Sequence, residues 1–271
     1  MTRSLGVLAA SLFAASCGTP ALMKLPMGPG APAADAGGVV AQATAACRGI
    51  NTITLEISVH GSAGGHKLRG RLTAGLATPA SARLEANAPF GQPIFIFVAR
   101  RDGNAGDASL LLPRDRRVLE HGNPADLLEA VSGVPLDAAS LRTLITGCAN
   151  APDGSDAVAF GDGWRVAPDG PDNVYFHRDS SSGPWRLVAT VRRDAWRAEY
   201  SMFENNLPRA IHIVSQPAGR FDLQMDLSQL EINVPLGPDA FRLEGTAGAA
   251  PITLEELRQS GPLGEPSTRV P

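Results

Sequence analysis

Apolar and polar residues alternate along much of the chain, which is the spacing of a β-strand with one buried face. In residues 52–60 the odd positions are apolar and the even positions between them are polar. The same alternation recurs at 68–76, 82–88, 185–192 and 196–202, with residues 61–65 forming the first turn. Short apolar segments spaced by Gly and Asp turns follow at 158–160, 164–166 and 174–176. The pattern predicts an antiparallel meander of about ten to eleven strands.

Two features depart from simple alternation. Residues 94–98 and 110–112 are apolar at every position, so both faces of these strands should be covered, by a helix or by an apolar cavity. Residues 221–227 and 230–234 carry their apolar positions in opposite phases, with the change near Ser228. Such a phase change predicts a β-bulge, which bends a strand as a curving sheet requires.

Helical spacing is strongest in the middle of the chain. Asn123 precedes Pro124 as an N-cap with proline at the first helical position, and Gly133 ends the predicted helix over 125–132. Asp137 is expected to cap a second helix over 138–146, closed by Gly147. Two short amphipathic helices inside a meander predict a lid over the sheet. Weaker helical patterns occur at 39–48 and 253–259.

The first residues are typical of an export signal. Arg3 precedes an apolar stretch of about a dozen residues, too short to span a bilayer, and small residues stand directly before Cys17. This arrangement resembles a bacterial lipobox, in which the thiol of the cysteine is diacylated and the new amine is acylated after cleavage. It departs from the usual pattern at Ala14, where most lipoboxes have Leu. A secreted protein with a coincidental cysteine is the alternative.

These features divide the chain into four parts. We predict a signal peptide at 1–16, a lipidated Cys17 with a flexible Pro/Gly/Ala-rich tether over 17–38, one folded domain at 39–260, and a disordered tail at 261–271. Several acyl chains anchor stably to a membrane where one does not. Gly18 stands where an Asp would signal inner-membrane retention, which favours the outer membrane.

The charge of the chain argues against nucleic acid as a partner, and its cysteine content leaves one pair of thiols to be explained. The 271 residues include 24 basic and 27 acidic side chains, so there is no basic footprint for nucleic acid. With Cys17 assigned to lipid, Cys47 and Cys148 remain, each at the C-terminal end of a predicted helix. An exported domain is exposed to oxidising conditions, so either a disulfide or two buried free thiols is expected.

Catalytic and metal-binding patterns were not found. The five histidines are scattered without an HExxH motif, and there is no GxSxG elbow, phosphate-binding loop or dinucleotide-binding glycine pattern. Aspartates over 153–172 do not have the spacing of an EF-hand and are interpreted as turn formers. We therefore expect neither an enzyme nor a metal or other cofactor.

Four stretches in order, 67–99, 110–137, 200–209 and 227–245, resemble the bacterial LolA/LolB-like lipoprotein-carrier superfamily, in particular LolB-like outer-membrane lipoproteins. The resemblance implies a mainly β fold, a half-open barrel made of one curved antiparallel sheet, with short helices as a lid. It also implies a hydrophobic cavity for acyl chains, and a protruding apolar loop for delivery, for which Pro89 and Phe90 are the candidates. The candidate cavity residues are Leu55, Ile57, Leu72, Leu84, Phe95, Phe97, Leu127, Leu128, Leu144, Trp185 and Trp196.

The resemblance implies a non-enzymatic carrier or acceptor, anchored by its lipid to the outer membrane and facing the periplasm. Its expected partners are acylated lipoproteins or lipids and a periplasmic carrier protein. An envelope sensor or structural lipoprotein that binds a protein partner with the same fold is the first alternative. A hydrolase with a dispersed site is the second.

Overall fold

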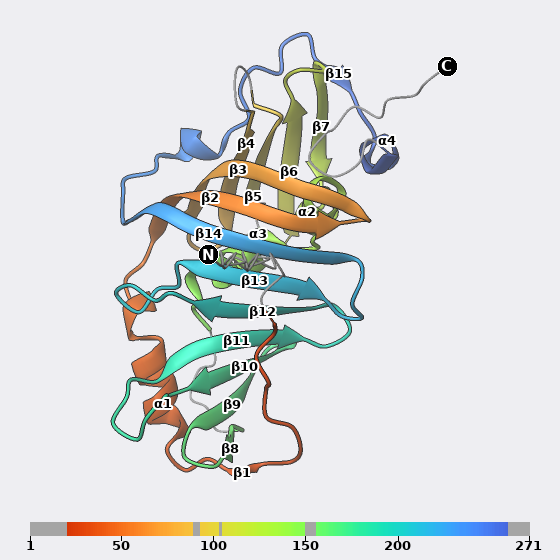
Figure 1. The fold of residues 1–271 in the computed structure, drawn as a ribbon. Helices are drawn as coiled ribbons and strands as arrows, with labels where there is room; N and C mark the ends of the chain where they lie inside the picture. The colour runs from red at the N-terminus through yellow and green to blue at the C-terminus, as the bar shows by residue number, and fades with distance from the viewer. Residues whose placement is uncertain (1–20, 89–92, 103–104, 150–155, 260–271) are drawn as a thin grey trace, which may run out of the picture.

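A computed structural model describes residues 21–88, 93–102, 105–149 and 156–259. Within these ranges the chain forms fifteen strands and a few short helices (Figure 1). The strands are β1 (Ala31–Pro32), β2 (Thr52–Ala63), β3 (His66–Ala77), β4 (Ser81–Asn87), β5 (Phe95–Asp102), β6 (Ala105–Leu112), β7 (Arg117–Gly122), β8 (Val158–Phe160), β9 (Trp164–Asp169), β10 (Asp172–His177), β11 (Arg186–Arg192), β12 (Trp196–Ser201), β13 (Ala210–Ser215), β14 (Phe221–Ile232) and β15 (Ala250–Pro251). The helical segments are α1 (Ala36–Ala43), η1 (Ala45–Cys47), α2 (Pro124–Ser132), α3 (Ala138–Thr146), η2 (Pro238–Phe241) and α4 (Leu254–Gln259).

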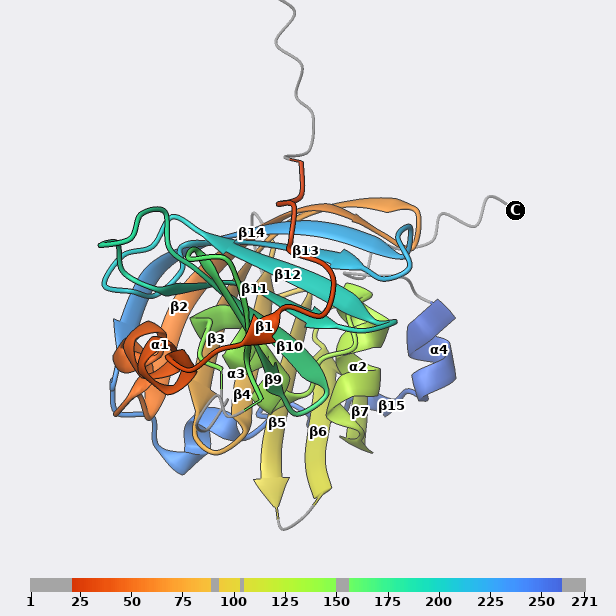
Figure 2. The ribbon, with the colours of Figure 1, turned by 90° about the horizontal axis from the view of Figure 1, so that it is seen from below.

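All fifteen strands belong to one curved sheet that does not close. Its order is β1-β8-β9-β10-β11-β12-β13-β14-β2-β3-β4-β5-β6-β7-β15, and each neighbouring pair is antiparallel except β15 with β7. Helices α1, α2 and α3 lie on the concave side (Figure 2). The predicted curved antiparallel sheet with short helices is confirmed. The predicted strand number was too low, partly because β1 and β15 have only two residues each and carry no periodic signal.

The alternation in the sequence corresponds to burial against the concave side. In β4 every second side chain is buried, including Leu84 at 4% exposure, and β12 alternates in the same way. Apolar side chains that share the concave face form a continuous core with the helices. Burial of this kind stabilises by about 25 cal/mol per Å² of apolar surface, so the core holds the sheet in its curved form.

The doubly apolar strand at 94–98 is covered on both faces, as its pattern predicts. Phe95 and Phe97 face the core, while Val98, on the other side of β5, is also buried. The outer cover is the segment after β14, in which η2 contacts β4 and β5 and Phe241 is buried. At Val98 the second cover is thus an irregular segment of the chain, while Ile96, on the same outer face, is only partly buried.

Both helix caps are confirmed. The Asn123 side chain accepts hydrogen bonds from the backbone N–H groups of Ala125 and Asp126 at 2.9 and 3.3 Å, and that of Asp137 accepts one from Ser140 at 2.7 Å. Gly133 and Gly147, which end α2 and α3, have φ of 76° and 64°. Glycine takes up this left-handed conformation without strain, so the local sequence defines both ends of each helix.

The predicted bulge in the last long strand is confirmed. The register between β14 and β2 shifts between Ser228 and Glu231, and Gln229 has φ of 49°. Two residues of β14, Gln229 and Leu230, lie opposite one residue of β2, and this one extra residue reverses which side chains face the core, which explains the phase change in the sequence.

The predicted boundary between tether and domain is wrong. Residues 21–38, expected to be a flexible tether, include β1, which pairs with β8, and the start of α1, where Ala36 is buried. The prediction failed because a Pro/Gly-rich segment has no periodicity, even when its backbone is bound to distant residues. The predicted signal peptide at 1–16, Cys17 and the tail at 261–271 lie outside the described residues.

Candidate functional site

An apolar cavity of about 80 Å³ lies between the concave face of the sheet and the lid, by which we mean residues 124–146. The lid consists of α2, α3 and the five residues that connect them. The lining comes from β2, β3, β4, β5, β13 and β14 on one side and from the lid on the other. The residues are Ile57, Val59, Leu68, Leu72, Leu84, Phe95, Leu128, Ser132, Val134, Leu136, Leu141, Leu144, Ile213, Leu223 and Met225.

Ser132 is the single polar residue among these described liners, and its hydroxyl is already satisfied. It donates a hydrogen bond to the Leu128 carbonyl at 2.7 Å and accepts one from the Val134 N–H at 3.2 Å. Apart from this hydroxyl, the side chains that line the cavity present carbon and the Met225 sulfur. Such a surface favours apolar groups, because their contact excludes water.

Six of the eleven candidate cavity residues line the cavity: Ile57, Leu72, Leu84, Phe95, Leu128 and Leu144. Leu55, Phe97 and Leu127 are buried in the core but do not line it. Trp185 and Trp196 are also buried outside the cavity, and each ring lies beside arginine guanidinium groups, those of Arg165 and Arg178 for Trp185 and of Arg192 for Trp196. The alternation identifies the buried face but not how far along each strand the lid extends.

The sequence interpretation missed nine of the liners. Val59 and Leu68 share the phase of Ile57 and Leu72, so the strand pattern contains a signal for them. Val134 and Leu136 lie in the connection between the lid helices, where neither a helical nor a strand period applies. The others are Ser132, Leu141, Ile213, Leu223 and Met225, and the three strand residues among them belong to β13 and β14, far from β2 in sequence.

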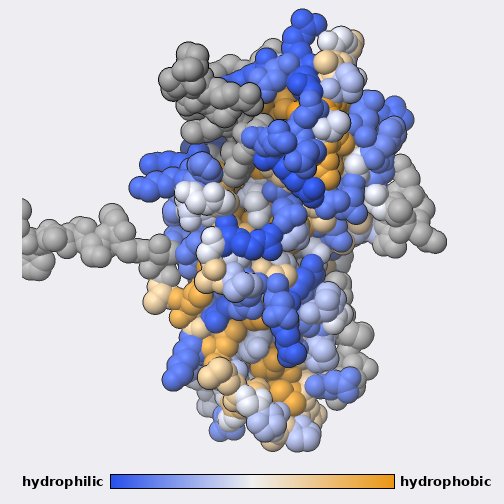
Figure 3. All heavy atoms as spheres, turned by 90° about the vertical axis from the view of Figure 1, so that its right-hand side faces the viewer, coloured by the Kyte–Doolittle hydropathy of each residue, from blue (hydrophilic) through white to orange (hydrophobic). Residues whose placement is uncertain are grey.

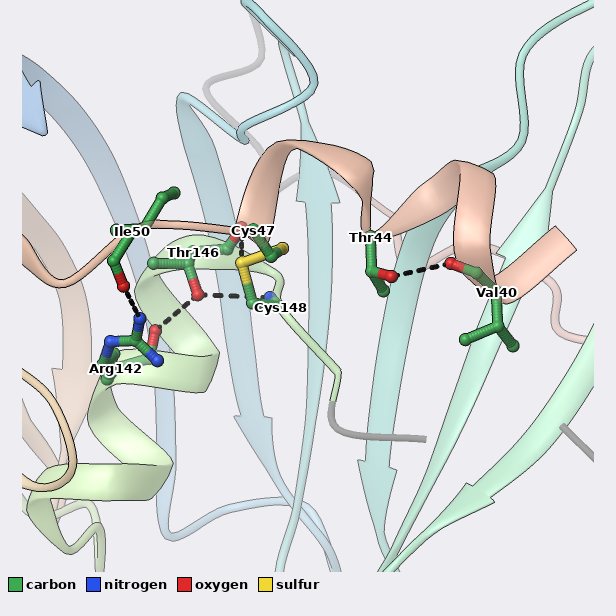
Figure 4. Close-up of a disulfide and its surroundings, with 7 residues drawn as sticks. All are labelled: Val40, Thr44, Cys47, Ile50, Arg142, Thr146 and Cys148. Carbon is green, nitrogen blue, oxygen red and sulfur yellow. Dashed lines mark hydrogen bonds between the residues drawn. A yellow bond between two sulfur atoms is a disulfide. The ribbon is translucent and has the colours of Figure 1, made fainter. Parts of the chain in front are cut away.

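A disulfide between Cys47 and Cys148 fixes the C-terminal end of the lid, so the structure contains the bonded one of the two arrangements left open by the sequence (Figure 4). The two Cα atoms are 5.7 Å apart, and the bond joins the end of η1 to the residue after Gly147. In the same region Arg142 of α3 donates to the Ile50 carbonyl, and burial lowers the pKa of Arg142.

A second and larger hollow, of about 540 Å³, lies on the outer face between β5, β6 and the segment at 244–249. Ile96 and Leu111, which are opposite each other in the sheet, line it together with Arg114, Arg116 and Glu244. All three charged residues are exposed. This groove is of mixed polarity, and the almost wholly apolar cavity beneath the lid is therefore the candidate site.

Pro89 and Phe90, the predicted delivery loop, lie outside the described residues, as does Cys17, the predicted lipidation site. Within the ranges that the structure describes, no helix is long and apolar enough to cross a membrane, and no cluster of His, Cys, Asp and Glu could hold a metal ion.

The chain is therefore a β protein with one open, curved antiparallel sheet, whose concave side holds an apolar cavity beneath short helices. Comparison with known proteins identifies the fold. The chain aligns with a LolA superfamily protein from Nitrosomonas europaea at TM-score 0.52 and 11% identity, over 77% of this chain and 98% of that one. It aligns with a DUF1329 family protein from Desulfovibrio piger at TM-score 0.52 and 10% identity, over 78% and 98%. The chain has the LolA/LolB-like fold, as its sequence predicted.

At the level of sequence alone, no family model and no curated protein matches the chain.

Proposed function

We propose that the protein is a non-enzymatic carrier or acceptor of acyl chains, anchored to the outer membrane by a lipid on Cys17 and facing the periplasm. The observation that supports this most directly is the lidded cavity, whose liners are apolar apart from one satisfied hydroxyl. Each methylene moved from water into such a site contributes about 0.8 kcal/mol, so an acyl chain of ordinary length gains enough to be held. The cargo would be acylated lipoproteins or lipids, received from a periplasmic carrier protein.

The cavity has to enlarge before it can accept a chain. Its volume of about 80 Å³ is well below the roughly 300–1,000 Å³ of ordinary ligand pockets. Val59, Ser132 and Met225 are the liners that are only partly buried, and Val59 and Met225 are opposite each other on β2 and β14. These residues mark the side on which the cavity approaches solvent.

We infer that helix α2 is the part of the lid that moves, and its apolar face, with Leu127, Leu128 and Val131, is buried in the closed state seen here. Its polar ties to the rest of the domain include the ion pairs of Glu129 with Arg220 and of Asp126 with Arg258, all of whose side chains are about one-third exposed or more. Exposed ion pairs contribute about 0–1 kcal/mol, so the barrier to opening comes mainly from the buried apolar side chains of α2 rather than from these pairs. The end of α3 is instead held by the disulfide. We infer that α2 and the connection at 133–137 swing away while the end of α3 stays in place.

Delivery would use the loop that carries Pro89 and Phe90. A large apolar side chain on a Pro-flanked turn can enter the bilayer interface and bring the cargo to it. This role rests on the sequence and its resemblance to LolB-like proteins.

The test is native mass spectrometry of the purified chain, together with displacement of a fluorescent fatty acid. We expect co-purified acyl species in the wild type. Met225→Glu puts a charge beside the apolar path and should weaken fatty-acid binding about tenfold or more. Met202→Glu is the matched control, because Met202 is 72% exposed and outside the cavity, and it should bind as the wild type does.

An empty protein that binds no fatty acid, or equal binding by the two glutamate variants, would contradict the proposal. An empty cavity with a captured protein partner would instead favour the envelope-sensor alternative. Cys17→Ala tests anchoring separately, since a variant that still partitions with membranes would count against lipidation.

A further inference from the structure

The segment at 21–30, which we call the strap, crosses the outer face of the sheet on the side opposite the lid (Figures 1 and 2). Its polar attachment is to β12. The backbone N–H of Met23 donates to both carboxylate oxygens of Glu199, at 2.9 and 3.0 Å. Arg197 donates to the Met23 carbonyl and also pairs with Glu199. The outward-facing side chains of Glu199 and Arg197 thus bind the backbone N–H and C=O of Met23.

The burial of outward-facing residues on β11 and β12 shows that the strap lies against the sheet. The side chains of Arg197 and Glu199 are only 14% and 13% exposed, although they point away from the core. Ala189 is directly opposite Glu199 on β11 and is completely buried on the same outer face. Hydrogen bonds to ionised groups are about twice as strong as neutral ones, and these are also shielded from water. The strap therefore covers this part of the sheet.

The outward side of the strap is apolar and basic. Among the described residues, only Leu22, Met27, Met202 and Ile232 are large apolar residues with high exposure, and two of these four belong to the strap. Met27 is the most exposed, at 87%, and Lys24 is exposed between Leu22 and Met27 in the sequence. Figure 3 shows apolar atoms at the surface where the described chain begins, at the left of the view.

The length of chain that precedes the strap limits where it can lie. Met23 follows Cys17 by six residues. At about 3.3–3.6 Å per extended residue, the Met23 Cα can be at most ~22 Å from the Cα of Cys17. Without the attachment to β12, the first fixed point would be Ala31 of β1, fourteen residues from Cys17 and at most ~50 Å away.

We propose that the strap is a bilayer-contact surface, with Leu22 and Met27 entering the interface and Lys24 meeting anionic headgroups. The proposal rests on the proposed lipid anchor at Cys17, which would hold the strap at the membrane. Amphipathic side chains with a basic residue among them are suited to the boundary between headgroups and acyl chains. The outer face of β11–β13 then faces the bilayer, and the lid, on the opposite side of the sheet, faces away from it.

The experiment compares the two lysines of the sequence, Lys24 and Lys67. Both are exposed, and only Lys24 is on the strap. The chain from Cys17 onward, which contains every described residue, is coupled through the Cys17 thiol to maleimide lipid. The vesicles contain phosphatidylethanolamine and phosphatidylglycerol. Cys47 and Cys148 are bonded to each other, so Cys17 is the free thiol. A membrane-impermeant amine reagent then labels the protein, and peptide mass spectrometry gives the labelling rate at each lysine.

We expect Lys24 to be labelled at least fivefold more slowly on vesicles than in solution, with Lys67 unchanged. Leu22→Ser/Met27→Ser leaves the tether and the attachment to β12 in place and should restore labelling of Lys24 to within twofold of its rate in solution. Equal rates for wild-type Lys24 on vesicles and in solution, or a double variant that stays protected, would overturn the proposal. Chemical coupling does not depend on lipidation in the cell, so a failure of the lipid anchor would be recognised separately by Cys17→Ala fractionation.

Discussion

Removing the disulfide between Cys47 and Cys148 should destabilise the domain strongly. The bond closes a loop with a sequence separation of 101 residues. In the chain-entropy model, a loop of this size restricts the unfolded chain by about 4.7 kcal/mol. Unfolding roughly 230 ordered residues at about 2.1 cal/mol/K each gives an entropy of about 0.5 kcal/mol/K. The Tm of Cys47→Ala/Cys148→Ala should therefore fall by about 10 °C.

Thermal unfolding followed by tryptophan fluorescence measures this difference. Alanine is the suitable replacement because Cys148 is 6% exposed and a serine hydroxyl there would lack water. Dithiothreitol should lower the Tm of the wild type towards that of the double variant and leave the variant unchanged. A double variant within about 2 °C of the wild type would refute the reasoning, as would an equal effect of dithiothreitol on both proteins.

Three further changes test local features of the fold. Asn123→Ala removes the cap of α2 and should cost about 1 kcal/mol in urea unfolding; an unchanged midpoint would contradict the role of the cap. A Cβ on Gly61, whose φ is 143°, would lie 2.0 Å from the Asp222 carbonyl oxygen, so Gly61→Ala should lower the free energy of unfolding by more than about 3 kcal/mol. Gly65→Ala is the control, because Gly65 has φ of 82° with open space around it, and it should cost about 1 kcal/mol. Equal losses of stability in the two variants would be inconsistent with a clash at Gly61. The Arg165 guanidinium lowers the pKa of Asp35, whose side chain is 52% exposed, so the pair should contribute less than about 1 kcal/mol. This stability is present above the ordinary pKa of Asp, about 3.9, and is lost as pH falls through the lower native pKa. Stability measured against pH should therefore show Asp35→Asn less stable than the wild type near neutral pH and equal to it in strong acid.

The sequence was sufficient to predict those helix ends and strand bends that neighbouring residues determine. The cap at Asn123 and the glycine at position 133 define α2 because each acts within one turn of the chain. The phase change near Ser228 indicated the bulge for a similar reason, since one inserted residue reverses the facing of all that follow.

Features that depend on distant residues could not be predicted. Met23 is bound by Glu199, which is 176 residues away, and no local period marks either residue as a partner. Leu55 and Ile57 have the same phase in β2, yet only Ile57 lines the cavity, because the position of the lid along the strand decides it. The sequence pattern thus identifies which face of each strand is buried, while the cavity also requires the register and the placement of the lid.

The two faces of the sheet are joined by a short covalent route. From Met23 on the outer face, the chain passes through β1 and α1 to Cys47, whose disulfide holds the end of the lid on the concave face. Along this route α1 is fixed by four buried residues, Ala36, Val39, Val40 and Ala43, so the connection is packed against the domain throughout the helix. The strap and the fixed end of α3 are therefore parts of one framework. The proposed enlargement of the cavity, now about 80 Å³, would therefore have to come from α2, whose polar ties are exposed ion pairs, whose apolar face would be uncovered, and whose C-terminal end is at Gly133.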